Sequence, residues 1–85
     1  MKSTKYTVTT IAQIVVPAKN YNRDVYLHVT GNGIVYLGGS DVTTSTGFLT
    51  EKASAPQPLF IPAGENVYAI VATATEDLRV FDWSN

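Results

Sequence analysis

The stretch RDVYLHVTGNGIVYL, residues 23–37, decides the fold class, because apolar and polar side chains alternate along its first half. A two-residue period is the period of a β-strand, whose successive side chains point to opposite faces of a sheet. Val25, Leu27 and Val29 therefore share one face, which we predict to be the core face. The residues between them occupy the outer face.

A glycine-rich triplet, Gly31-Asn32-Gly33, follows this strand directly, and IVYL, residues 34–37, comes next. Glycine adopts positive φ without steric penalty, which tight hairpin turns require. We therefore predict that Gly31 and Gly33 supply the positive-φ positions of a hairpin between residues 23–30 and 34–37.

The rest of the chain repeats the pattern of short strands separated by turn residues. Further strands are predicted at residues 5–16, 59–61, 67–72 and 78–83, with a turn around Gly64. This spacing indicates an all-β fold, a small antiparallel β-sandwich or jelly-roll-like barrel of about six to eight short strands. We predict one domain over residues 1–85, with a short N-terminal arm of about residues 1–11 that reaches a neighbouring subunit or simply frays.

The hydroxyl-rich stretch GGSDVTTSTGFL, residues 38–49, is predicted to be a connection between strands. Gly38 and Gly39 lack the lysine and helix of a phosphate-binding loop, and paired glycines instead let a strand bend at a corner. After Gly47, Phe48 and Leu49 are expected to return the chain to the core. The hydroxyls are expected to hydrogen-bond locally or to a neighbouring subunit.

No constellation of residues indicates catalysis or a cofactor. Ser40 and His28 form a nucleophilic triad on paper with Asp24, Asp41 or Asp77, but any sequence with these residue types offers such a set. Zinc requires more than one histidine in a chain without cysteine, and calcium requires converging carboxylates. We therefore predict no catalytic residues, no metal site and no cofactor.

Composition points to association with other protein. Charged residues make up 15% of the chain, against roughly 25% in typical soluble domains. Eleven threonines supply much of the polarity. The six basic residues do not cluster, so nucleic acid is not an expected partner. Thr7, Thr9 and Gln13 interrupt the apolar run that a signal peptide needs, and no stretch has the length of a membrane span, so no membrane partner is expected.

Two kinds of contact surface remain open. The candidate residues of a protein interface are Tyr26, His28, Tyr36, Thr43 and Thr44. A glycan-binding surface would instead use exposed rings from Tyr21, Tyr26 or Trp83, although aromatic side chains in so small a domain are expected to lie mainly in its core.

The strings GNGIVYLGGSDVTTSTGFL and IPAGENVYAIVATATEDLRV, residues 31–49 and 61–80, resemble small structural proteins of tailed bacteriophages. The resemblance covers residues 23–81. It implies a non-enzymatic virion protein, made in the bacterial cytoplasm, that decorates or cements a capsid. The implied partners are the major capsid protein or another virion protein, and further copies of the chain, with a trimer favoured. The alternative is a tail or head-fibre module that binds host-surface glycans.

Overall fold

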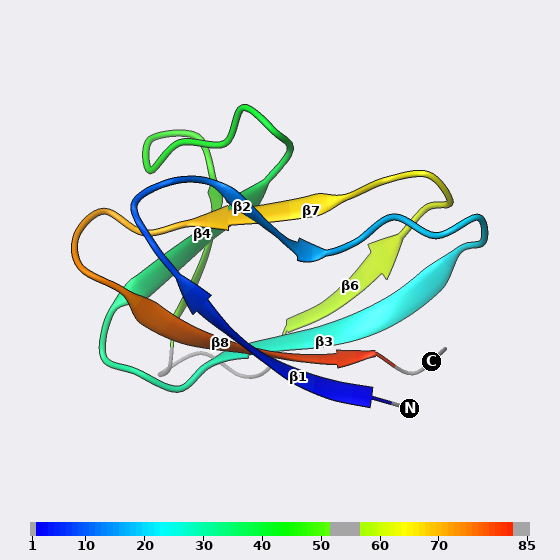
Figure 1. The fold of residues 1–85 in the computed structure, drawn as a ribbon, viewed down its shortest axis with the longest axis horizontal. Coiled ribbons are helices and arrows are strands. Elements are labelled where there is room, and N and C mark those ends of the chain that lie inside the picture. Colours follow the sequence, from blue (N-terminus) through cyan, green and yellow to red (C-terminus); the bar gives the residue numbers. More distant parts are fainter. Residues whose placement is uncertain (1, 52–56, 83–85) are drawn as a thin grey trace.

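The computed structural model describes residues 2–51 and 57–82. Over these residues the chain has no helix and forms eight β-strands (Figure 1). In chain order the strands are β1 (Lys2–Val8), β2 (Gln13–Val16), β3 (Arg23–Val29), β4 (Ile34–Gly38), β5 (Phe48–Glu51), β6 (Gln57–Ile61), β7 (Val67–Ile70) and β8 (Glu76–Asp82). The prediction of an all-β fold of short strands is confirmed.

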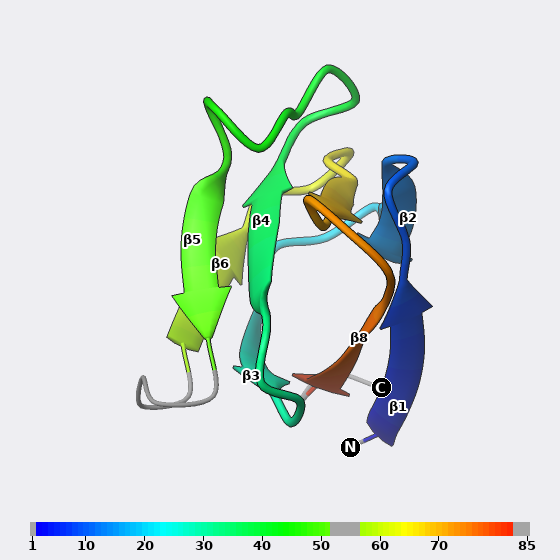
Figure 2. The ribbon, with the colours of Figure 1, turned by 90° about the vertical axis from the view of Figure 1, so that its left-hand side faces the viewer.

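The strands form two antiparallel sheets. Sheet A has the order β1-β8-β3-β6, and sheet B has the order β2-β7-β4-β5. The first strand pairs with the last, β2 with β7, β3 with β6, and β4 with β5, so the chain is a series of nested hairpins folded over into two layers. This nesting is the jelly-roll arrangement. Figure 2, turned by a quarter from Figure 1, shows β4 and β5 of sheet B beside each other, with β3 and β8 of sheet A beyond one end of β4.

Aliphatic side chains fill the space between the sheets. Val25, Leu27 and Val29 of β3 are fully buried, as their alternation predicted. They belong to a core that consists of Val8, Val15, Val16, Val25, Leu27, Val29, Val35, Leu37, Ile61, Ala69, Val71, Leu78 and Val80. Fully burying a side chain of this kind is worth about 1.5–3 kcal/mol. Nine of these thirteen residues are valine or isoleucine, β-branched residues that also favour the strands that carry them.

Large aromatic side chains lie mostly outside this core. Phe48, Phe60 and Phe81 are 60%, 58% and 37% exposed, and Tyr26 is 36% exposed. The expectation that aromatic residues lie mainly in the core is wrong for these four side chains. Trp83 lies outside the described residues. The chain thus places large apolar surface on its exterior, where a partner can bury it.

The prediction of a tight hairpin at residues 31–33 is wrong. β3 belongs to sheet A and β4 to sheet B, so the connection between them crosses from one sheet to the other. Neither Gly31 nor Gly33 has a positive φ, and among the described glycines only Gly64 does. Gly33 N–H donates to Oε2 of Glu76 at 2.9 Å, and a Cβ on Gly31 would overlap Oε1 of Glu76. The two glycines make room for this carboxylate.

The N-terminal segment is part of the sandwich. Residues 2–8 form β1, which pairs along its whole length with β8, so the predicted arm over residues 1–11 is wrong for the part that the structure describes. The predicted continuous strand over residues 5–16 is also interrupted. The hydroxyl of Thr9 bonds to both the N–H and the C=O of Ile11, and the chain passes from sheet A to sheet B there.

The connection over residues 39–47 joins β4 to β5 within sheet B, so it is a loop between two strands, as predicted. The hydroxyl of Thr43 accepts hydrogen bonds from Ser45 N–H and Thr46 N–H, both at 3.2 Å. This hydroxyl of the loop therefore bonds locally, as expected. Phe48 and Leu49 do not return to the core. Thr50 is the buried residue of β5, because it lies opposite Val35 on the inner face.

Candidate functional site

The residues proposed on paper for a nucleophilic triad belong to opposite layers. His28 lies on the outer face of sheet A, beside Arg79, whereas Ser40 lies in the loop that follows β4 of sheet B. Among residues 2–51 and 57–82, no group of three or more His, Cys, Asp or Glu is placed to hold a metal ion. The same residues include no helix long and apolar enough to cross a membrane.

The outer face of sheet B carries a continuous set of apolar side chains. Leu49, Tyr36 and Ile70 lie side by side across β5, β4 and β7, and Tyr68 lies beside Ile14 of β2 in the adjacent row. We call this surface the apolar face, which consists of Ile14, Ile34, Tyr36, Leu49, Tyr68 and Ile70. Ile14 is 40% exposed and Leu49 is 47% exposed. The apolar face therefore exposes large hydrophobic side chains to solvent.

Charge is nearly absent from this sheet. Among the described strand residues of sheet B, Glu51 alone is charged, and it lies at the end of the edge strand β5, opposite Ile34. The outer face of sheet A is different, because Lys5, Arg79 and His28 lie side by side across β1, β8 and β3. A strand with one face exposed to water normally alternates apolar and polar residues, whereas a strand covered on both faces is apolar throughout.

The sequence contained a signal for the apolar face. IVYL in β4 and VYAI in β7 are uninterrupted apolar and aromatic runs, the pattern of strands buried on both sides. The expected interface residues included only Tyr36 from this face. Tyr26 and His28 lie on the outer face of sheet A, and Thr43 and Thr44 lie in the loop that follows β4. The structure thus distributes the expected interface over three separate regions.

Sheet A carries a smaller aromatic surface. Tyr26 of β3 lies between Phe81 of β8 and Pro58 of β6, and Phe60 follows in the next row opposite Asp24. We call Tyr26, Phe60 and Phe81 the aromatic row. Tyr21, another ring expected to be exposed, is 41% exposed but precedes β3. Exposed rings beside a carboxylate are the arrangement expected of a glycan-binding surface.

A cavity of about 460 Å³ opens between the two sheets at the side where the edge strands β5 and β6 lie. Its apolar lining includes Leu37, Phe48, Phe60 and Val67. Phe48 and Phe60 come from the edge strands themselves and are each more than half exposed. The unpaired backbone groups of an edge strand readily pair with another chain. This side of the sandwich is therefore a second apolar region.

Comparison with protein-family models, with curated proteins and with solved structures finds no match to this chain.

Proposed function

We propose that the protein is a non-catalytic structural subunit that associates with further copies of itself through the apolar face and decorates the capsid of a tailed bacteriophage. The apolar face is the observation that carries the association. Six large apolar or aromatic side chains on an almost uncharged sheet are poorly solvated, and such a surface is typical of a protein–protein interface.

The energy available from this surface is substantial for a small domain. Fully burying an isoleucine or leucine side chain is worth about 1.5–3 kcal/mol, so covering the exposed 40–47% of Ile14 and Leu49 contributes roughly 1 kcal/mol for each. The four half-buried members of the face add to this. A further copy of the chain is the favoured occupant, because an apolar surface almost without charge buries no unpaired charge when it packs against a neighbouring subunit.

The bacteriophage setting rests on the sequence patterns of residues 31–49 and 61–80, together with a fold that also forms viral capsid proteins. In this setting the protein is a virion component whose partners are the major capsid protein or another virion protein. Its expected assembly is a trimer. Quantitative mass spectrometry of purified particles tests the setting: copies comparable to the capsid protein support decoration, and absence from the particles contradicts it.

The association is tested by placing a charge in the apolar face. We expect Leu49→Glu to lower the association constant at least tenfold, because a carboxylate would be buried without a partner. Phe81→Glu is the matched control, since Phe81 is 37% exposed on the outer face of the opposite sheet. Sedimentation velocity at several concentrations reports the mass of each variant against the 9.2 kDa chain. Equal association of both variants would contradict the proposal.

The aromatic row favours a second function, binding of host-surface glycans by a tail or head-fibre module. Tyr26, Phe60 and Phe81 offer ring faces beside Asp24, which supplies a hydrogen-bond acceptor for sugar hydroxyls. Phe60→Ala should abolish glycan binding on an array or by NMR titration. Phe48→Ala removes a similarly exposed ring from β5 and should leave binding unchanged. Retention of binding by Phe60→Ala would contradict this second function.

A further inference from the structure

Arg23 is a charged residue in an apolar layer. It begins β3 and lies in phase with Val25 and Leu27, so its side chain enters the space between the sheets. The residue is 4% exposed and its side chain is fully buried. A buried charge costs several kcal/mol unless it is paired and its donors are satisfied. The partners of each guanidinium nitrogen therefore decide what this residue does.

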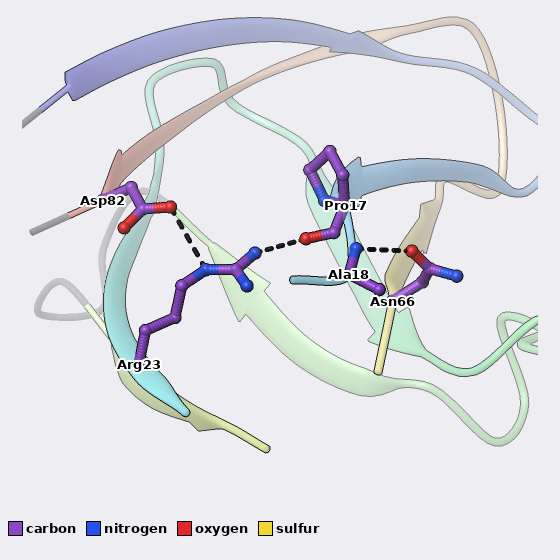
Figure 3. A network of polar contacts seen from close by, with 5 residues as sticks. All are labelled: Pro17, Ala18, Arg23, Asn66 and Asp82. Atoms are coloured by element: carbon purple, nitrogen blue, oxygen red, sulfur yellow. Dashed lines mark hydrogen bonds and ion pairs between the residues drawn. The ribbon is translucent and has the colours of Figure 1, made fainter. Parts of the chain in front are cut away.

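Two of the three guanidinium nitrogens face acceptors from different parts of the chain (Figure 3). Nε lies 3.2 Å from Oδ2 of Asp82 in β8, and Nη2 donates to the carbonyl oxygen of Pro17. The residue after Pro17 is itself fixed, because Ala18 N–H donates to Oδ1 of Asn66 at 2.7 Å. The guanidinium is thus held in one orientation. Nε and Nη1 are both buried, and neither has a hydrogen-bond partner within residues 2–51 and 57–82, although Nε lies within ion-pair distance of Asp82.

Arg23 also forms part of the wall of a cavity of about 180 Å³ that is distinct from the apolar cavity near β5 and β6. The wall includes two further cations, Lys2 and Lys19, and one carboxylate, that of Asp82. Among the lining residues that the structure describes, three positive charges and one negative charge leave a formal charge of +2 around the cavity. Thr4 and Tyr6, which each carry a hydroxyl group, also line the cavity.

We propose that this cavity binds a compact oxyanion, a carboxylate or a phosphate group, next to Arg23. Oxyanions are the acceptors that a guanidinium with an unsatisfied donor recognises best, and the two lysines add charge without competing acceptors. The volume is below the roughly 300–1,000 Å³ of pockets for drug-sized ligands, so the ligand group is small. Asp82 and Pro17 hold the guanidinium in place before the anion arrives, which lowers the entropic cost of binding. This site is independent of the apolar face.

The chain supplies an internal control for a direct test, because Arg79 is its second arginine and lies exposed on the outer face of sheet A. Side-chain 15N–1H spectra would be recorded while sodium phosphate or sodium acetate is added at constant ionic strength, with sodium chloride as the balancing salt. We expect a saturable shift of the Arg23 Nε–H signal and no saturable shift of the Arg79 signal. A lower dissociation constant for phosphate or for acetate identifies the preferred oxyanion. No saturable Arg23 shift with either salt overturns the proposal.

A variant at Lys19, in the connection that follows β2, tests the contribution of a cavity lysine without disturbing the core. Lys19→Gln should weaken oxyanion binding about 1.5- to 5-fold, the effect of one partly exposed ion pair. Lys5→Gln is the matched control, because Lys5 is exposed on the outer face of β1 and does not line the cavity. The preferred anion should also raise the melting temperature of the wild type by roughly 5–10 °C at ten times its dissociation constant. Equal dissociation constants for the two variants would overturn the site.

Discussion

Gly38 ends β4 at a point where the following loop folds back against it. A Cβ on Gly38 would lie 2.8 Å from Cγ2 and 3.0 Å from Cβ of Val42, a side chain that is only 7% exposed. Val42 has little room to retreat, because its N–H donates to the carbonyl oxygen of Gly39 at 3.1 Å. The φ of Gly38 is not positive. Any cost of Gly38→Ala therefore comes from the added methyl group rather than from backbone strain.

The expected magnitude follows from two opposing terms. Overpacking of this kind costs about 1–3 kcal/mol. Replacing glycine by alanine recovers about 0.4–1 kcal/mol by restricting the unfolded chain. Gly38→Ala should therefore lower the free energy of unfolding by about 1–2 kcal/mol, which corresponds to a melting temperature roughly 4–16 °C lower.

The neighbouring glycine gives a matched control of opposite sign. A Cβ on Gly39 would meet only Oδ1 of Asp41, at an ordinary 3.6 Å. Gly39→Ala should therefore raise the free energy of unfolding by about 0.4–1 kcal/mol. Urea unfolding followed by circular dichroism measures both variants. In a Val42→Ala background the penalty of Gly38→Ala should largely disappear, because the clashing Cγ2 is gone. Equal stabilities of Gly38→Ala and Gly39→Ala would refute this steric reasoning.

Three other substitutions test the turns and the buried ion pair, each by the same unfolding assay. Gly64 has a φ of 86° with open space around its Cβ position, so Gly64→Ala should cost about 1–2 kcal/mol and Gly64→Asn less; equal costs would contradict the backbone explanation. Glu76→Ala removes the acceptor of Gly33 N–H and should cost about 1–3 kcal/mol, whereas Glu76→Gln keeps an acceptor and should cost less. Asp82→Ala leaves Arg23 without its ion-pair partner and should cost about 3–5 kcal/mol; a loss below 1 kcal/mol would mean that the pair is already solvated.

The strands of this fold can be predicted from the sequence because the inner residues recur at every second position. In β3 every second residue is buried, and Val25, Leu27 and Val29 identify the core face without any tertiary information. The same periodicity continues back to Arg23, which is buried in phase with the valines. Phase therefore predicts the burial of this arginine, although its charge suggests a surface position.

The pairing of strands was harder to infer than their existence. A glycine-rich triplet indicates a turn, but it does not state whether the next strand returns to the same sheet. β3 finds its partners in β6 and β8, which are distant in sequence, and the carboxylate of Glu76 occupies the turn. The break at Thr9 is similarly concealed, because threonine and isoleucine favour strands and the bend depends on a hydroxyl contact to Ile11.

The apolar face was predictable from composition within strands, whereas the cavity beside Arg23 was not. IVYL and VYAI show by themselves that β4 and β7 are apolar on both faces. Lys2, Lys19 and Arg23 are scattered along the sequence, and only the nesting of β1, β2 and β3 brings them around one cavity. The spacing of these residues in the sequence does not predict that they line one cavity.

The central claim, burial of the apolar face between copies of the chain, is tested most directly by the solvent exposure of individual methyl groups. Relaxation of methyl signals by a soluble paramagnetic agent would be measured at low and at high protein concentration. The methyls of Ile14 and Leu49 should become protected as concentration rises, while Ile11, which is 76% exposed and lies outside the apolar face, stays accessible. Unchanged accessibility of Ile14 and Leu49 in an associated sample would contradict the claim.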